Sequence, residues 1–253
     1  MFWRILLFLS SFFSTVFAVP ESYLQKVYDE YVVAESAETL AERNEGFNRA
    51  LKSYIDLERD YPFCGGQLYA NIGNCFYQLR EWGWAIYYYE KALQRMPREN
   101  SIKEKIKKIH LRAELPLKEN RNFFLEKRVS FLEKEILFIV CFAFYILLSL
   151  YAKFFEKKCA KTWYLLSFSG GISLFFLLSL FGDVYFSKKE GIFISPVQLY
   201  KDVGFHCDLV KKKPFSSGEK VQVLESLERG EWLKVVTSDG STGYVFYKCM
   251  RIL

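Results

Sequence analysis

Histidine and the motifs of familiar catalytic sites are nearly absent from this chain. Among 253 residues there are two histidines, His110 and His206, and no GxSxG, GxxxxGK[ST] or HExxH motif. Neither histidine has the spaced Cys, His, Asp or Glu partners of a metal site. Cys207 follows His206, but adjacent side chains seldom point at each other, which argues against a cysteine nucleophile. We therefore expect no enzymatic activity, metal or cofactor, unless the fold assembles a convergent polar pocket.

Cysteine is also scarce, and the excess of positive charge is small. Six cysteines cannot form a disulfide scaffold for a chain of this length, and 19% aromatic residues are too many for a disordered tail. The net charge is +6, and from Val19 to Lys134 the 19 basic and 18 acidic side chains nearly cancel. Charge therefore gives no reason to expect a nucleic-acid partner.

Charge is missing altogether from three hydrophobic runs, of which the first is Ile5–Val19. Residues 1–18 are typical of a signal peptide, because Arg4 precedes the apolar stretch and Val16-Phe17-Ala18 supplies a small-residue cleavage site. An uncleaved anchor helix is the alternative, although the run is short for a membrane span. Either way, we expect the following residues to be exported.

The other two runs, Ile136–Ala152 and Trp163–Phe181, are long enough for membrane-spanning helices. We expect spans at residues 136–152 and 163–182, with Gly170-Gly171 permitting close packing, and a linker at residues 117–135. The connection at residues 153–162 has four lysines and one glutamate. Lysine-rich loops favour the cytoplasm, so we expect both soluble domains on the periplasmic side of a bacterial inner membrane.

A helical repeat is encoded between Ala50 and Pro97. Its positions are Tyr69, Ile72, Gly73, Phe76, Ala85, Tyr89, Ala92, Leu93 and Pro97. This spacing is that of a tetratricopeptide repeat, a unit of about 34 residues with two antiparallel helices. Gly73 and Ala85 are small where the helices approach, and Pro97 ends the second helix. The sequence therefore predicts an all-α tetratricopeptide domain over residues 19–116.

The preceding copy of the repeat is incomplete. Ala50-x3-Tyr54 repeats Ala85-x3-Tyr89, but its first helix, expected around Tyr31 to Arg43, carries Glu38 in place of the glycine. A further helix over Ser101–Leu115, stopped by Pro116, is expected to cap the array.

Such an array commonly binds a peptide in a groove. If this one resembles other members of its family, four residues of the first helix of the clear repeat are the groove candidates: Gln67, Asn74, Tyr77 and Gln78, with Ala70 beside them. The alternative is that these residues pack against the neighbouring helix.

After the second span the period of the pattern changes to that of strands. Val221 and Val223 alternate with polar residues, Trp232–Val236 and Gly243–Phe246 form further short runs, and glycines mark turns. Residues 183–253 therefore predict a small all-β barrel. The segments Ile192–Ile194, Leu199-Tyr200, Ser217–Leu224, Glu231–Val235 and Asp239–Val245 resemble a bacterial SH3 domain.

The resemblance to that family implies an aromatic groove for peptides or cell-wall material, with Tyr200, Trp232 and Tyr244 as candidates. The alternative for Trp232 is a place in the core of the barrel. Lys211-Lys212-Lys213 is interpreted as a solvated loop.

Topology places four of the six cysteines in the two exported domains, one in a span and one in the cytoplasmic loop. Cys64 and Cys75 lie in the repeat domain, and Cys207 and Cys249 lie in the barrel. Because disulfides persist in exported compartments, we predict a Cys207–Cys249 bridge and, with less support, a Cys64–Cys75 bridge.

The order of signal peptide, tetratricopeptide repeats, two spans and SH3-like domain resembles the Bat-type aerotolerance proteins, in particular the BatE-like group. Tyr69, Gly73, Ala85 and Pro97 match the repeat pattern. The resemblance implies a membrane-anchored protein–protein interaction scaffold for stress tolerance or envelope maintenance, beside von Willebrand factor A-type membrane proteins and a MoxR-type ATPase. The alternative is a sensor or anchor that binds peptidoglycan through the SH3-like domain.

Overall fold

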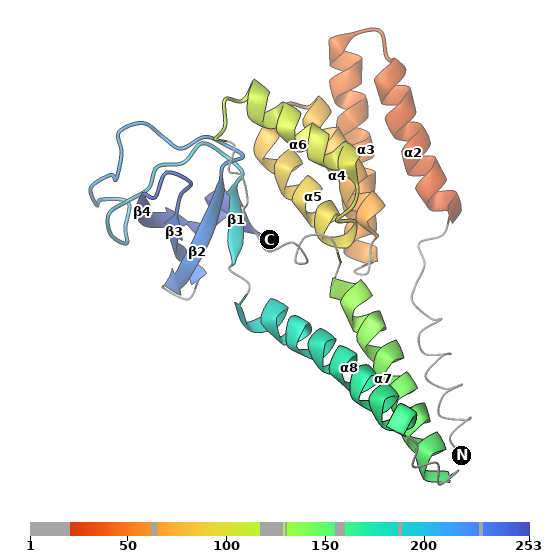
Figure 1. Cartoon of the computed structure of the whole chain (residues 1–253). Coiled ribbons are helices and arrows are strands. Elements are labelled where there is room, and N and C mark those ends of the chain that lie inside the picture. The colour runs from red at the N-terminus through yellow and green to blue at the C-terminus, as the bar shows by residue number, and fades with distance from the viewer. Residues whose placement is uncertain are drawn as a thin grey trace. The chain divides into compact units, whose positions relative to one another are not determined.

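The computed structural model describes residues 21–61, 65–116, 129, 131–154, 160–186, 189–227 and 230–253 (Figure 1). Contacts divide the chain into two compact units. One unit contains most of helices α2 to α6 together with a five-stranded sheet, and the other contains α7 and α8 with residues 94–98. The expected mixture of a helical array, two apolar helices and an antiparallel sheet is confirmed at this level. The predicted signal peptide, residues 1–18, lies outside the described residues.

The helical array begins with a hairpin of α2 (Glu21–Ser36) and α3 (Leu40–Asp60) (Figure 1). Thr39 starts α3 through a capping box, in which its hydroxyl accepts from the Glu42 amide at 3.2 Å. The prediction of one helix around Tyr31 to Arg43 is therefore wrong, and Glu38 lies in the turn. The close approach occurs elsewhere, because a Cβ on Gly46 would lie 2.6 Å from the Ala34 Cβ.

The second hairpin consists of α4 (Gly66–Gln78) and α5 (Trp82–Arg95), and α6 (Asn100–Arg112) follows it. A Cβ on Gly73 would lie 2.7 Å from the Tyr89 ring, so the predicted close approach at this glycine is confirmed. Helix α5 ends two residues before Pro97, as expected of a helix breaker. The capping helix ends at Arg112, four residues before Pro116, and it buries Ile102 and Ile109.

The sheet domain comprises β1 (Glu190–Phe193), β2 (Lys220–Leu227), β3 (Trp232–Val236), β4 (Thr242–Phe246) and β5 (Met250–Ile252). The strands are antiparallel in the order β4-β3-β2-β1-β5. A long loop from residue 194 to 219 connects β1 to β2. It contains two isolated bridges of its own and pairs with β4 through a third, between Tyr200 and Tyr244. Leu233 and Val235 of β3 join Phe193, Val245 and Met250 in one core.

Helices α7 (Phe131–Phe154) and α8 (Ala160–Phe186) pack against each other. Within them, Glu133–Lys153 and Trp163–Gly182 are long and apolar enough to span a membrane. A Cβ on Gly170 would touch the Tyr145 ring at 3.4 Å, whereas the space around Gly171 is open. Of the two predicted packing glycines, only Gly170 therefore faces α7.

Candidate functional site

The first candidate site is a polar face that α4 and α6 build together from Asn74, Tyr77, Lys105 and Arg112. The Asn74 side-chain oxygen accepts hydrogen bonds from the Tyr89 hydroxyl at 2.9 Å and from Lys105 Nζ at 2.7 Å. Arg112 donates to the Tyr77 hydroxyl at 2.7 Å, and its guanidinium lies 5.4 Å from the centre of that ring. Two of the predicted groove residues are thus brought together with two cations that the sequence analysis did not single out.

The electrostatics of the polar face centre on Lys105. Burial lowers the pKa of its ammonium group, and the charge of Lys108 lowers it further, while Glu35 and Glu99 act in the opposite direction. Burial also raises the pKa of Tyr89, so this phenol remains a donor to Asn74 at neutral pH. The face therefore presents a half-buried cation that its surroundings do not fully compensate.

The other predicted groove residues lie in different surroundings. Gln78 interacts with the phenol of Tyr31 on α2, and Ala70 is buried. Gln67 is exposed near the start of α4, where its amide donates to Asn71 of the same helix at 3.4 Å. Asn74 and Tyr77 fit the alternative prediction, contact with a neighbouring helix, because α6 supplies a hydrogen-bond partner to each.

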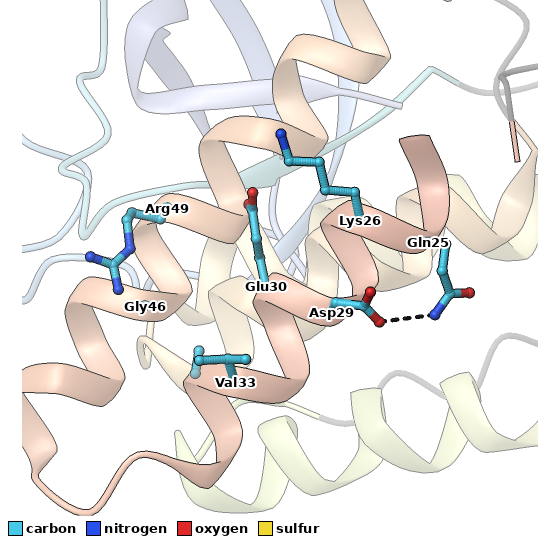
Figure 2. Close-up of a pocket in the computed structure, with 8 residues that line it drawn as sticks. Gln25, Lys26, Asp29, Glu30, Val33, Gly46 and Arg49 are labelled. Atoms are coloured by element: carbon cyan, nitrogen blue, oxygen red, sulfur yellow. Dashed lines mark hydrogen bonds between the residues drawn. The ribbon is translucent and has the colours of Figure 1, made fainter. Parts of the chain in front are cut away.

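An open hollow of about 600 Å³ lies between α2 and α3 rather than on α4 (Figure 2). It forms where Gly46 lets α3 approach Ala34, so that longer side chains surround the contact. Three of its charged groups already have partners. Asp29 accepts from Gln25 at 2.9 Å, Glu30 accepts from Ser53 at 2.8 Å, and Arg49 pairs with Glu45 at 3.1 Å. This hollow is consequently the weaker candidate.

A second candidate site is an aromatic cluster on the sheet domain, made of Tyr200, Phe205, Trp232, Phe246 and Tyr247. The Trp232 ring centre lies 5.8 Å from that of Tyr200, 4.9 Å from that of Phe205 and 5.8 Å from that of Phe246. Trp232 is 4% exposed, but Phe205, above it in the long loop, is 60% exposed. Trp232 is therefore covered by a loop and lies outside the core that Leu233 and Val235 share.

Tyr244, the third predicted groove residue, is attached to the edge of this cluster. Its backbone forms two hydrogen bonds with Tyr200, of 3.0 and 2.8 Å, and Lys234 lies 5.7 Å from its ring centre. Phe205, Phe246 and Tyr247 were not among the predicted groove residues. Phe246 could have been found, because it is two residues from Tyr244 on the same strand and so on the same face.

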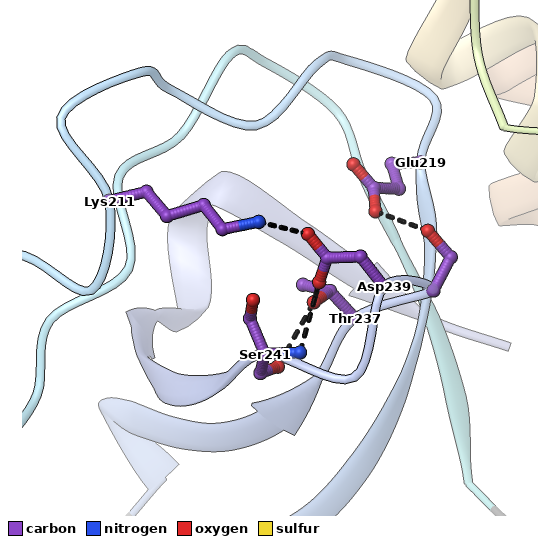
Figure 3. A network of polar contacts seen from close by, with 6 residues as sticks. Lys211, Glu219, Thr237, Asp239 and Ser241 are labelled. Atoms are coloured by element: carbon purple, nitrogen blue, oxygen red, sulfur yellow. Dashed lines mark hydrogen bonds and ion pairs between the residues drawn. The ribbon is translucent and has the colours of Figure 1, made fainter.

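The long loop that carries Phe205 is fastened to the β3–β4 turn by a polar network (Figure 3). Asp239 accepts from Lys211, from the Thr237 hydroxyl at 2.5 Å and from the Ser241 amide at 2.9 Å. The pKa of the Asp239 carboxyl is held far below its usual range, mainly by Lys211 and to a smaller extent by Thr237 and Ser241. Lys211 is exposed, as interpreted, and in addition it anchors the loop through Asp239.

We expect Asp239→Asn to weaken this attachment in a pH-dependent way. A carboxyl whose pKa is lowered by folding stabilises the fold above its unfolded pKa, about 3.9, and loses that contribution as pH falls through the folded value. The variant should open the β3–β4 turn more easily by about 1 kcal/mol at pH 7. The difference should shrink below about pH 4.

Hydrogen exchange of the full chain in detergent micelles measures this effect of Asp239→Asn. Asp208→Asn is the matched control, because Asp208 pairs with Lys201 at 3.3 Å and its side chain is 83% exposed; it should change exchange little. Equal effects of the two variants at pH 7 would contradict the role assigned to Asp239.

The predicted disulfides are not formed in the structure, where Cys75, Cys207 and Cys249 are free thiols. Cys207 donates to the Val203 carbonyl at 3.4 Å within its own turn. Cys249 packs against the core of the sheet domain instead. Burial raises the pKa of the Cys75 thiol to about 12, which makes it unreactive, and Cys64 lies outside the described residues.

No protein-family model matches the sequence, and no curated protein matches it significantly. Among the described residues, no three His, Cys, Asp or Glu side chains gather as a metal site would require. The polar face and the aromatic cluster are therefore the features from which a function can be argued.

Proposed function

We propose that this chain is a membrane-anchored protein–protein interaction scaffold of the bacterial envelope. In this proposal α2 to α6 are a short tetratricopeptide array, the sheet domain is an SH3-like barrel, and α7 and α8 anchor both in the inner membrane with the domains in the periplasm. The close approach of Gly73 to Tyr89 supports the first assignment. The strand order β4-β3-β2-β1-β5, with a long loop after β1, supports the second.

The observation that carries the proposal is that the two cations of the polar face have neutral hydrogen-bond partners. Within the described part of the chain, the hydrogen-bond partners of Lys105 and Arg112 are neutral, namely the Asn74 amide oxygen and the Tyr77 hydroxyl. Charge-assisted bonds to a carboxylate are stronger than bonds to neutral acceptors. An acidic segment of a partner protein would therefore gain two such bonds by replacing the neutral partners.

Site-specific photo-crosslinking in intact membranes tests this role. The crosslinking residue replaces Leu111, which is 63% exposed and adjacent to Arg112. We expect discrete protein adducts that fall about tenfold, or 1.4 kcal/mol, in the double variant Lys105→Gln/Arg112→Gln. The matched control is Lys103→Gln/Lys107→Gln, which removes two exposed cations of the same helix and should retain the adducts. Equal losses in the two double variants would overturn the proposal.

A second candidate function, cell-wall binding, is favoured by the exposure of Phe205 over Trp232. An aromatic surface with one open ring can stack on sugars of peptidoglycan, as the resemblance to SH3 domains implies. Sedimentation of the full chain with purified sacculi, together with an absence of protein adducts at Leu111, would support this function over the scaffold.

A further inference from the structure

Within the first compact unit, α5 and the sheet domain meet at two glycines. A Cβ on Gly83 of α5 would lie 2.5 Å from the Phe193 carbonyl oxygen and from the Ser217 hydroxyl. A Cβ on Gly218 would lie 2.8 Å from Ile86 of α5. Both glycines are buried. The two backbones are therefore in contact over a surface that has no room for a methyl group.

Paired charges cross the same contact. Lys220, at the start of β2, lies 3.5 Å from Glu90 of α5 and 2.7 Å from Glu190 of β1. Burial by itself would lower the pKa of Lys220, but the two carboxylates outweigh burial and raise it. Nearby, the Arg251 guanidinium lies 5.0 Å from the centre of the Trp84 ring. The contact thus combines close packing with one ion pair, Glu90–Lys220, that forms only when the two domains are joined.

We infer that the sheet domain is a fixed part of the helical array, docked on α5 through Gly83, Gly218 and the Glu90–Lys220–Glu190 cluster, rather than a module on a flexible tether. Except for residues 94–98, the array and the sheet domain belong to one compact unit, although α7 and α8 separate them in the sequence. Docking holds the sheet domain against the α5 side of the hairpin, and Asn74 and Tyr77 of α4 keep their contacts with α6.

Docking also has a consequence for membrane topology. Two domains in direct contact must lie on the same side of a membrane. If α7 and α8 span it, the chain must cross, turn and return, so the connection between them lies on the opposite side. This consequence rests on the membrane anchoring in the proposed function, whereas the docking itself does not.

A matched pair of glycine variants tests the docking. Gly218 and Gly240 have φ values of +92° and +83°, so an alanine strains the backbone at both positions. Only Gly218 has α5 as a neighbour, because nothing lies within 4 Å of a Cβ on Gly240. In the full chain in detergent micelles, we expect Gly218→Ala to speed amide exchange in α5 at least tenfold, and Gly240→Ala to leave it unchanged.

A second test replaces Gly83 by alanine, because docking and intrinsic helix propensity predict opposite effects of this substitution. Alanine normally stabilises a helix relative to glycine, yet Gly83→Ala should also speed exchange in the strands β1 and β2. Gly65→Ala is the control, since nothing lies within 4 Å of a Cβ on Gly65. Unchanged exchange in both Gly83→Ala and Gly218→Ala would overturn the docking, whatever the photo-crosslinking at Leu111 shows.

Labelling of intact cells with a membrane-impermeant maleimide tests the topology. Lys103→Cys on α6 and Lys212→Cys on the long loop are both exposed positions, and mass spectrometry assigns the label to each peptide. We expect the two positions to label to the same extent. Labelling of one without the other would overturn the same-side arrangement, even if adducts at the polar face persist.

Discussion

Replacing Trp232 by alanine is expected to lower the free energy of opening of the sheet domain by about 3–5 kcal/mol, the range for truncating a buried large aromatic side chain. The indole is 4% exposed and contacts the rings of Tyr200, Phe205 and Phe246. Ring pairs of this kind stabilise by about 0.5–1.5 kcal/mol beyond their buried area. Because Phe205 belongs to the long loop, the loss should be felt in that loop as well as in β3.

Hydrogen exchange of the full chain in detergent micelles separates the effect of Trp232→Ala by segment. Tyr247→Ala provides the comparison, because Tyr247 lies at the rim of the same cluster and is 41% exposed. It should cost less than about 1 kcal/mol. A cost for Trp232→Ala no greater than that for Tyr247→Ala would show that the cluster does not hold the loop on the sheet.

The position of Trp232 shows which contacts the periodicity of a strand can predict and which it cannot. Alternation along β3 correctly places Leu233 and Val235 in the core, and by the same rule it places Trp232 on the other face. Burial of Trp232 on that face depends on Phe205, which lies 27 positions earlier in a loop with no periodic signal. A contact between a loop and a distant strand leaves no local pattern, so neither hypothesis for Trp232 described the cover that the structure shows.

The helical hairpins illustrate the same limit in the helical part. The α4–α5 hairpin could be predicted closely, because Gly73, Ala85 and Pro97 act locally on helix approach and helix ending. The preceding hairpin could not be placed by copying that spacing, since α3 starts at Leu40, well before the position that the repeat implies. Thr39 and Glu42 carry the capping signal that was overlooked.

The cations of the polar face were missed for a related reason. Lys105 and Arg112 lie on α6, which the sequence analysis treated only as a cap for the array. They become candidates only through their hydrogen bonds to Asn74 and Tyr77, which lie 31 and 35 positions away in the sequence. Residue type and spacing within one helix identify a candidate, whereas a site made by two helices becomes visible only when their faces are known to meet.

Removing the carboxylate of Glu58 is expected to destabilise the helical array by about 2–3 kcal/mol, the strength of hydrogen bonds to a charged group that is largely removed from water. Glu58 of α3 accepts from Lys91 at 2.6 Å and from the Tyr88 hydroxyl at 2.9 Å, both on α5. Lys91 also lies 4.1 Å from the centre of the Tyr69 ring on α4. The Glu58–Lys91 pair therefore joins three helices, and Glu58→Ala would remove the carboxylate from beside Lys91, whose side chain is 22% exposed.

The stability that Glu58 contributes depends on the protonation of Lys91. Burial lowers the pKa of Lys91, but Glu58 outweighs burial and raises it. Burial, with Glu58 second, raises the pKa of Tyr88. A lysine whose pKa is raised by folding contributes stability at all pH values below its unfolded pKa, about 10.4, and loses it as pH rises through the folded value. The destabilisation by Glu58→Ala should therefore be constant from about pH 6 to pH 9.

Glu45→Ala is the matched control for Glu58→Ala on the same helix. Glu45 pairs with Arg49 at 3.1 Å, with side chains that are 71% and 67% exposed, and such a pair contributes about 0.3–0.5 kcal/mol. Exchange from α3 and α5, measured on the full chain, should rise sharply for Glu58→Ala and hardly at all for Glu45→Ala. Glu58→Gln should fall between them, because an amide oxygen still accepts from Tyr88 but no longer balances the charge of Lys91. Similar exchange in all three variants would mean that the packing of α3 on α4 holds the two hairpins together without the Glu58–Lys91 pair.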